Sequence, residues 1–319
     1  MSAKGKVSVV VGVAAVLMLV VSVFAFSSFK NTDGGSCRRQ IQIPDTVFQS
    51  SYIIPIPIPE KLTFAGEDVP LKYFDVRESL DRELQVNTFW HSQTVILLKK
   101  ANRFFSVIEP ILKKNGIPDD FKYLAVAESG LSQAVSPSKA VGFWQILEGT
   151  AKDYGLEVNS EVDERYHIEK STEVACRYLL KSFQKYGNWT MAAASYNFGS
   201  NGISKQMDRQ ENDSYYDMVL GEETGRYVFR ILAIKVIFEN PERYGFFLDK
   251  RDLYPPYQFT EVKVDTAITS IAQFARQFDS NYKLIKMLNP WLRENYLTNK
   301  SRKTYSIKIP EKGFRETAY

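Results

Sequence analysis

The spacing of apolar and polar positions divides the chain into four parts. Residues 7–29 contain no charged side chain, and the stretch from Asn31 to about Pro70 is polar and then punctuated by proline. Apolar residues then recur at helical spacing, and after Tyr254 they return in short stretches. We therefore predict an N-terminal membrane anchor or signal segment over 1–30, a linker and N-terminal extension over 31–86, a helical domain over 87–245 and a small module over 258–311.

The central part carries the periodicity of amphipathic helices. One helix face is marked by Val95, Leu98, Phe105, Ile108 and Leu112, and this helix is expected to end at Gly116. The next helix opens at Pro118, with acidic residues in its first turn, and closes at Gly130. Further helices are predicted over 148–154, 171–186, 190–196 and 224–238. This domain is expected to be nearly all helical.

The two flanking regions have different patterns. In IIPIPIPE, residues 53–60, a proline at every second position prevents a regular hydrogen-bond ladder, so an extended spacer or edge element is expected. Near the C-terminus, FTEVKV and YSIKIP read as strands, and residues 268–278 and 282–288 as helices between them. The predicted fold class is therefore mainly α, followed by a small α+β module of βααβ order.

The uncharged segment over 7–29 is long enough to cross a bilayer, which takes ~20 apolar residues as a helix. Lys4 and Lys6 precede it, so the N-terminus is expected in the cytoplasm and the body outside it. A cleaved signal peptide is the alternative, but this run exceeds the usual apolar core of such peptides, which favours a retained anchor. Cys37 could be free, lipidated or paired with Cys176.

Composition narrows the chemistry. Lys and Arg number 41 against 37 Asp and Glu, a net charge of +4, and no basic run occurs, so nucleic acid is not an expected partner. Two His and two Cys, none clustered at ligand spacing, predict no metal site, and we expect no cofactor. Catalysis would then depend on carboxylates, hydroxyls and amides.

Glu128 is the main candidate for such chemistry. In PDDFKYLAVAESG, Phe121, Leu124 and Ala125 form an apolar stripe, and Glu128 falls seven residues after Phe121 on the same helix face. A carboxyl group in that position either faces a cleft or is partly desolvated, which raises its pKa and suits a general acid. The alternative is that Glu128 reaches water or pairs with a nearby Lys or Arg.

Several short motifs occur around and after Glu128. They are Glu128-Ser129, Ser136-Pro137, VGFWQ ending at Gln145, GNWTMAAASYNFG with Tyr196-Asn197, and EETGRYVFRILA with Tyr227. In this order, over about 102–237, they resemble the catalytic core of the soluble-lytic-transglycosylase family of the lysozyme-like superfamily, particularly its membrane-bound D-type branch. The resemblance implies a lysozyme-like helical catalytic domain.

The resemblance also implies a reaction. Glu128 matches the family's catalytic residue, a general acid that protonates the β-1,4 glycosidic oxygen between N-acetylmuramic acid and N-acetylglucosamine in peptidoglycan. The same group, now a base, then deprotonates the muramic O6 hydroxyl, which closes to a 1,6-anhydro product. Implied substrate-binding residues are Ser129, Ser136, Gln145, Tyr196, Asn197 and Tyr227. Glycosidases that use water need two carboxylates, and no second one is obvious between Ser129 and Gln145.

The C-terminal module resembles a degenerate LysM fold, a family that binds glycans containing N-acetylglucosamine. Val264 stands where that family usually has glycine. Glycan binding and a purely structural role both remain open. All the catalytic matches lie upstream of Tyr254, so cleavage is expected not to need the module. A true hydrolase and a non-catalytic wall-binding scaffold are the rival functions. Retention of Glu128 argues against the scaffold. The expected partner is the peptidoglycan strand, and the expected location is the cell envelope.

Overall fold

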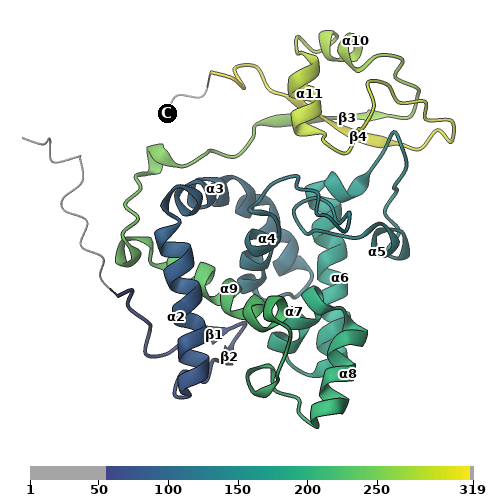
Figure 1. Cartoon of the computed structure of the whole chain (residues 1–319). Helices are drawn as coiled ribbons and strands as arrows, with labels where there is room; N and C mark the ends of the chain where they lie inside the picture. The colour runs from purple at the N-terminus through teal and green to yellow at the C-terminus, as the bar shows by residue number, and fades with distance from the viewer. Residues whose placement is uncertain (1–54, 317–319) are drawn as a thin grey trace, which may run out of the picture. The chain divides into compact units, whose positions relative to one another are not determined.

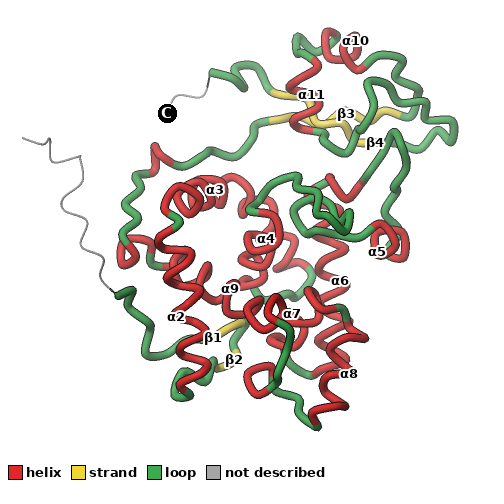
Figure 2. The backbone as a smooth tube through the Cα atoms, viewed as in Figure 1, coloured by secondary structure: helices red, strands yellow, loops and turns green. Residues whose placement is uncertain are grey.

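The computed structural model describes residues 55–316, which are mostly helical (Figures 1 and 2). A hairpin of β1 (Thr63–Phe64) and β2 (Glu67–Asp68) comes first. The longer helices of the central domain are α2 (Phe74–Phe89), α3 (His91–Lys114), α4 (Lys122–Ser129), α5 (Glu148–Asp153), α6 (Ile168–Tyr186), α7 (Trp189–Phe198), α8 (Ser200–Gln210) and α9 (Glu222–Glu239). The predicted fold class, a helical domain followed by a small α+β module, is confirmed.

The helices predicted around Glu128 are found where the sequence placed them. Helix α3 buries Ile108 and Leu112 completely, and α4 begins just after the short 3₁₀ turn Asp119–Phe121. Gly130 ends α4 in a left-handed conformation, with φ +58°, and its N–H donates to the carbonyl of Val126. Glycine adopts this conformation without steric cost, which is why the helix stops there. Helix α8 was not predicted.

The N-terminal extension differs from its interpretation as a linker up to residue 86. Phe64 of the hairpin and Leu80 and Leu84 of α2 are fully buried in the core of the helical domain. The apolar stripe of α2 is narrow and set among charged residues, so its sequence gave little sign of burial. The proline-rich segment also lies against this domain, because the Tyr244 hydroxyl donates to the carbonyl of Pro57 over 3.1 Å.

This extension supports the helices that carry the candidate site. The Glu67 carboxylate in the hairpin accepts hydrogen bonds from the Thr190 N–H (2.9 Å) and hydroxyl (2.7 Å) at the start of α7. The N–H of Ala65 donates to Asp120 over 2.7 Å, and Asp120 also pairs with Lys235 of α9 at 2.7 Å. Helix α9 in turn contacts α2, α4 and α7, so it forms the centre of the domain.

The C-terminal module has the predicted strand, helix, helix, strand order. Its elements are β3 (Phe259–Val264), α10 (Ile271–Arg276), α11 (Tyr282–Leu288) and β4 (Tyr305–Pro310). The strands pair antiparallel, from Phe259 opposite Pro310 to Val264 opposite Tyr305. Its buried core continues into Val162 and Tyr166 of the helical domain, so the two share one hydrophobic cluster.

Within residues 55–316 no helix is long and apolar enough to cross a membrane. The segment predicted to do so, 7–29, and Cys37 lie outside the described residues. Cys176 is buried in α6 and is a free thiol.

Candidate active site

Glu128 lies in the last turn of α4, beyond the buried stripe of Phe121 and Leu124. The hydroxyl of Tyr227, from α9, donates a hydrogen bond to its carboxylate. Burial raises the pKa of Glu128 to about 7, although the Tyr227 hydrogen bond and the charge of Arg230 act in the opposite direction. A carboxyl group with this pKa can hold a proton at neutral pH and give it up during a reaction.

Three of the predicted residues line one pocket. Gln145, Tyr196 and Asn197 contribute to a cavity of about 300 Å³. Burial raises the pKa of Tyr196 well above its usual value, and the charge of nearby Glu128 raises it further. The Asn197 amide oxygen accepts a hydrogen bond from the Thr224 hydroxyl at 2.8 Å. Its amide nitrogen makes no hydrogen bond within the described part of the chain, so it can donate to a ligand.

Gln145 belongs to the site loop, residues 130–147, which joins α4 to α5. Its amide nitrogen donates to the carbonyls of Ala134 (3.0 Å) and Gly142 (2.8 Å) within the loop. The neighbouring Trp144 is fully buried, and its indole N–H donates to the Thr172 hydroxyl at 2.8 Å. The side chains of Trp144 and Gln145 therefore hold the loop in one conformation.

Ser129 and Ser136 are used inside the protein. The Ser129 hydroxyl donates to the carbonyl of Phe143 over 2.9 Å, which fastens the end of α4 to the site loop. The Ser136 hydroxyl accepts from the N–H of Ala140 at 3.0 Å and closes a turn of that loop. Tyr196 makes a similar link, because its hydroxyl donates to the carbonyl of Trp144 at 2.7 Å. These residues shape the pocket whether or not they also touch a ligand.

Two parts of the chain match models of known families. Residues 105–219 match the model of the transglycosylase SLT domain, and residues 260–313 match that of the soluble lytic transglycosylase C-terminal LysM-like domain. The chain contains an SLT transglycosylase domain. The match to the SLT domain includes Glu128, Gln145 and Asn197, and it ends before Tyr227.

Two curated relatives come from Escherichia coli, one from strain K12 and one from strain O6:H1, and both are named membrane-bound lytic murein transglycosylase D. Each is 28% identical to this chain over 183 residues, which are 56% of this chain and 40% of the relative. The match therefore spans less than half the length of these relatives.

The structure adds a charged cluster, formed by residues outside the SLT match, whose charges act on Glu128 and which the sequence did not reveal. Glu83, on α2, is buried and accepts a hydrogen bond from Arg226 at 2.7 Å, while Arg230 lies 3.9 Å away from it. Arg230 also pairs with Glu223 at 3.0 Å. Arg226 and Arg230 flank Tyr227 on α9, and this was the feature of the sequence that could have pointed to the cluster. No such feature pointed to Glu83, because it lies in the segment interpreted as an extension.

Replacing Tyr227 with phenylalanine is expected to move the upper limit of the activity profile to higher pH. The substitution removes a hydrogen bond that lowers the pKa of Glu128 but keeps the ring that desolvates it. Glu128 would then stay protonated to a higher pH. The measurement is the rate of product release from purified cell walls between pH 5 and about 9. Tyr178→Phe is the control, because the Tyr178 hydroxyl donates to the carbonyl of Ser195 instead. An unchanged or lowered upper pH limit would contradict the proposed effect of Tyr227 on the pKa of Glu128.

Proposed function

We propose that this chain is a peptidoglycan lytic transglycosylase. It would cleave the β-1,4 bond between N-acetylmuramic acid and N-acetylglucosamine and leave a 1,6-anhydro-muramic end. One observation carries the proposal: Glu128, with a pKa near 7 and a hydrogen bond from Tyr227, lies within an SLT domain. The E. coli relatives, named lytic murein transglycosylases, support the substrate class.

In this proposal Glu128 acts twice. It first donates its proton to the glycosidic oxygen as the bond to the leaving sugar breaks, and the resulting carboxylate then takes the proton from the muramic O6 hydroxyl. That hydroxyl forms the new bond to the anomeric carbon, so no water is consumed. The Tyr227 hydroxyl and the charge of Arg230 would stabilise the carboxylate between the two steps.

The other predicted residues would hold the sugar. The amide nitrogen of Asn197, which has no hydrogen-bond partner among residues 55–316, suits the carbonyl of an N-acetyl group. Gln145 and Tyr196 line the same pocket and would fix the ring beside the acid. Ser129 and Ser136 would contribute mainly through the site loop, since their hydroxyls already bond to it.

Hydrolysis is the rival reaction, and it would require a second, available carboxylate. Glu223 acts on Glu128 through its charge, but both of its oxygens are bound by Arg230, at 3.0 and 3.3 Å. This pairing favours the intramolecular route. Mass spectrometry of the products released from purified cell walls tests it, because the anhydro product is lighter by one water than the hydrolysed one. Reducing-end products alone would overturn the proposed reaction.

We also propose that residues 7–29 anchor the chain in the membrane and place the catalytic domain in the cell envelope outside the cytoplasm. The uncharged stretch and the preceding Lys4 and Lys6 support this orientation. In fractionated cells, the full-length protein should sediment with membranes and be released by detergent but not by high salt. Recovery of protein with an intact N-terminus in the soluble fraction would refute the anchor.

A further inference from the structure

The LysM-like module is joined to the SLT domain along residues 157–169, here named the clamp segment, which leads from the end of α5 into the first turn of α6. The N–H of Asp163 donates to the carbonyl of Trp291 at 2.9 Å, and that of Arg293 to Glu161 at 2.7 Å. Val162 and Leu292 form a strand-like bridge between these bonds, and both are buried. The module thus adds a short strand pairing to the clamp segment.

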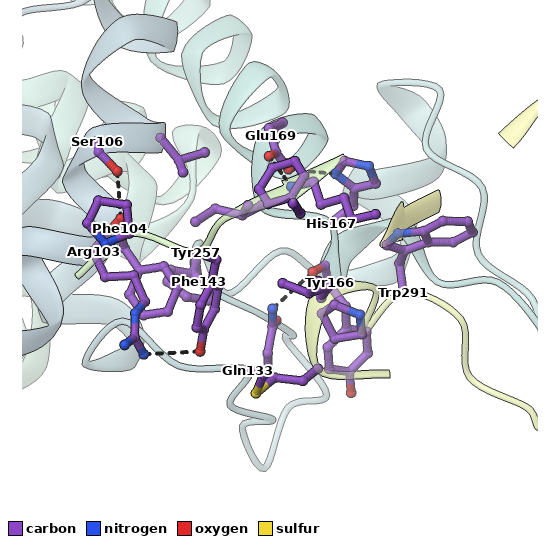
Figure 3. Close-up of a pocket in the computed structure, with 18 residues that line it drawn as sticks. Arg103, Phe104, Ser106, Gln133, Phe143, Tyr166, His167, Glu169, Tyr257 and Trp291 are labelled. Carbon is purple, nitrogen blue, oxygen red and sulfur yellow. Dashed lines mark hydrogen bonds and ion pairs between the residues drawn. The ribbon is translucent and has the colours of Figure 1, made fainter. Parts of the chain in front are cut away.

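Side chains extend this junction. Trp291 is buried, with its ring stacked on His167 at 5.9 Å between centroids, and the guanidinium of Arg293 lies 3.9 Å from the ring centre of Tyr166. Lys308 of β4 pairs with Glu169. Figure 3 shows Trp291 and His167 on one side of the pocket at this junction. Gln133 and Phe143 of the site loop also line this pocket.

The clamp segment in turn holds the site loop. The buried guanidinium of Arg165 pairs with Asp163 at 2.7 Å and donates to the carbonyl of Lys139 at 3.1 Å. The amide nitrogen of Gln133 donates to the carbonyl of Tyr166 at 3.0 Å. A series of direct contacts therefore runs from the module, through the clamp segment, to the loop.

The loop then reaches the candidate catalytic groups. The carbonyl of Phe143 accepts from Ser129, the residue after Glu128, and that of Trp144 accepts from Tyr196. Gln145 follows and lines the sugar pocket. Side chains that must hold a reacting group within a fraction of an ångström have to be fixed in place by the residues that pack against them.

We propose that the LysM-like module is a clamp that holds the site loop, and hence Gln145 and the end of the Glu128 helix, in the geometry needed for cleavage. As a statement about catalysis this rests on the proposed function. It reverses the expectation from the sequence that cleavage does not need the module. A module that only retained the enzyme on its substrate would leave the cleavage of short soluble glycans unaffected.

The test uses Trp291→Ala in the full-length chain, with hydrogen exchange followed by mass spectrometry. The N–H groups of Gly142 and Ile146 are hydrogen-bonded within the site loop, at 2.9 and 3.0 Å. In the variant their exchange is expected to accelerate by about tenfold. On short soluble peptidoglycan fragments, kcat should fall by a similar factor while KM changes less. Tyr282→Ala is the matched control, because it truncates a half-exposed aromatic of the module that lies against Lys286 and not against the clamp segment.

A second variant covers the case in which Trp291→Ala unfolds the module. Glu161→Ala removes a carboxylate that accepts hydrogen bonds from the N–H and hydroxyl of Thr298 in the module, at 2.7 and 2.9 Å. It should produce a smaller increase in loop exchange and a smaller fall in kcat. Unchanged loop exchange in both variants, or unchanged kcat with faster exchange, would overturn the proposal. Exchange is measured without substrate, so it reports on the clamp even if wild type releases no anhydro product, the result that would instead refute the proposed function.

Discussion

Replacing Glu128 with glutamine is expected to abolish glycan cleavage while the protein keeps its fold. Glutamine has nearly the same volume and can still meet the Tyr227 hydroxyl, but it cannot deliver a proton to the glycosidic oxygen. General acid–base catalysis is worth ~10²–10⁴ in rate, and one group performs both proton transfers here, so the loss should lie at or above the upper end. The measurement is release of anhydro-muropeptides from purified cell walls, with circular dichroism as the folding control.

The same variant gives a second, independent readout. Burial raises the pKa of Glu128 from 4.5 to about 7, so the folded protein binds this proton more tightly than the unfolded chain. The contribution of Glu128 to the free energy of unfolding is therefore fully present below about pH 4.5, falls as the pH rises to about 7 and is constant above it. Glu128→Gln should lose this dependence and be relatively more stable at pH 8. Cleavage at the wild-type rate by a folded variant would remove Glu128 from the mechanism.

Replacing Gly142 with alanine is expected to destabilise the protein strongly. An added Cβ would lie 2.4 Å from the carbonyl oxygen of Arg165, a backbone atom that cannot move alone, and the residue has φ +80°. The strained conformation costs about 1–3 kcal/mol, and the clash adds to it. We expect the free energy of unfolding to fall by about 3 kcal/mol or more, as measured by chemical denaturation, and cleavage to fall with it because the loop carries Gln145.

Gly187→Ala separates the two effects. Gly187 ends α6 with φ +76°, but no atom lies within 4 Å of its added Cβ. It should therefore show only the conformational cost, about 1 kcal/mol, with cleavage retained. Equal losses of stability in the two variants would mean that the loop accommodates the clash, and that the contact between Gly142 and Arg165 does not hold the loop in place.

The amino-acid sequence by itself determined the features that depend on neighbouring residues. Helical periodicity placed α3 and α4, and Gly116 and Gly130 marked their ends, because amphipathic spacing and left-handed glycines act within a few residues. The same spacing put Glu128 beside a buried stripe and so anticipated its raised pKa. The motifs that resemble the transglycosylase family supplied the remaining candidates, and all of them except Tyr227 lie within residues 105–219, which match the SLT domain.

Only the tertiary structure decided which distant groups meet. Tyr227 reaches Glu128 from 99 residues away, and Glu83 reaches Arg226 from 143 residues away across α2 and α9. No local pattern encodes such contacts, because they depend on how whole helices pack. The burial of α2 was missed for the same reason. The module was predicted as a separate unit from its own strand and helix pattern, whereas its bonds to the clamp segment come from backbone groups of Asp163 and Trp291, which every residue type provides.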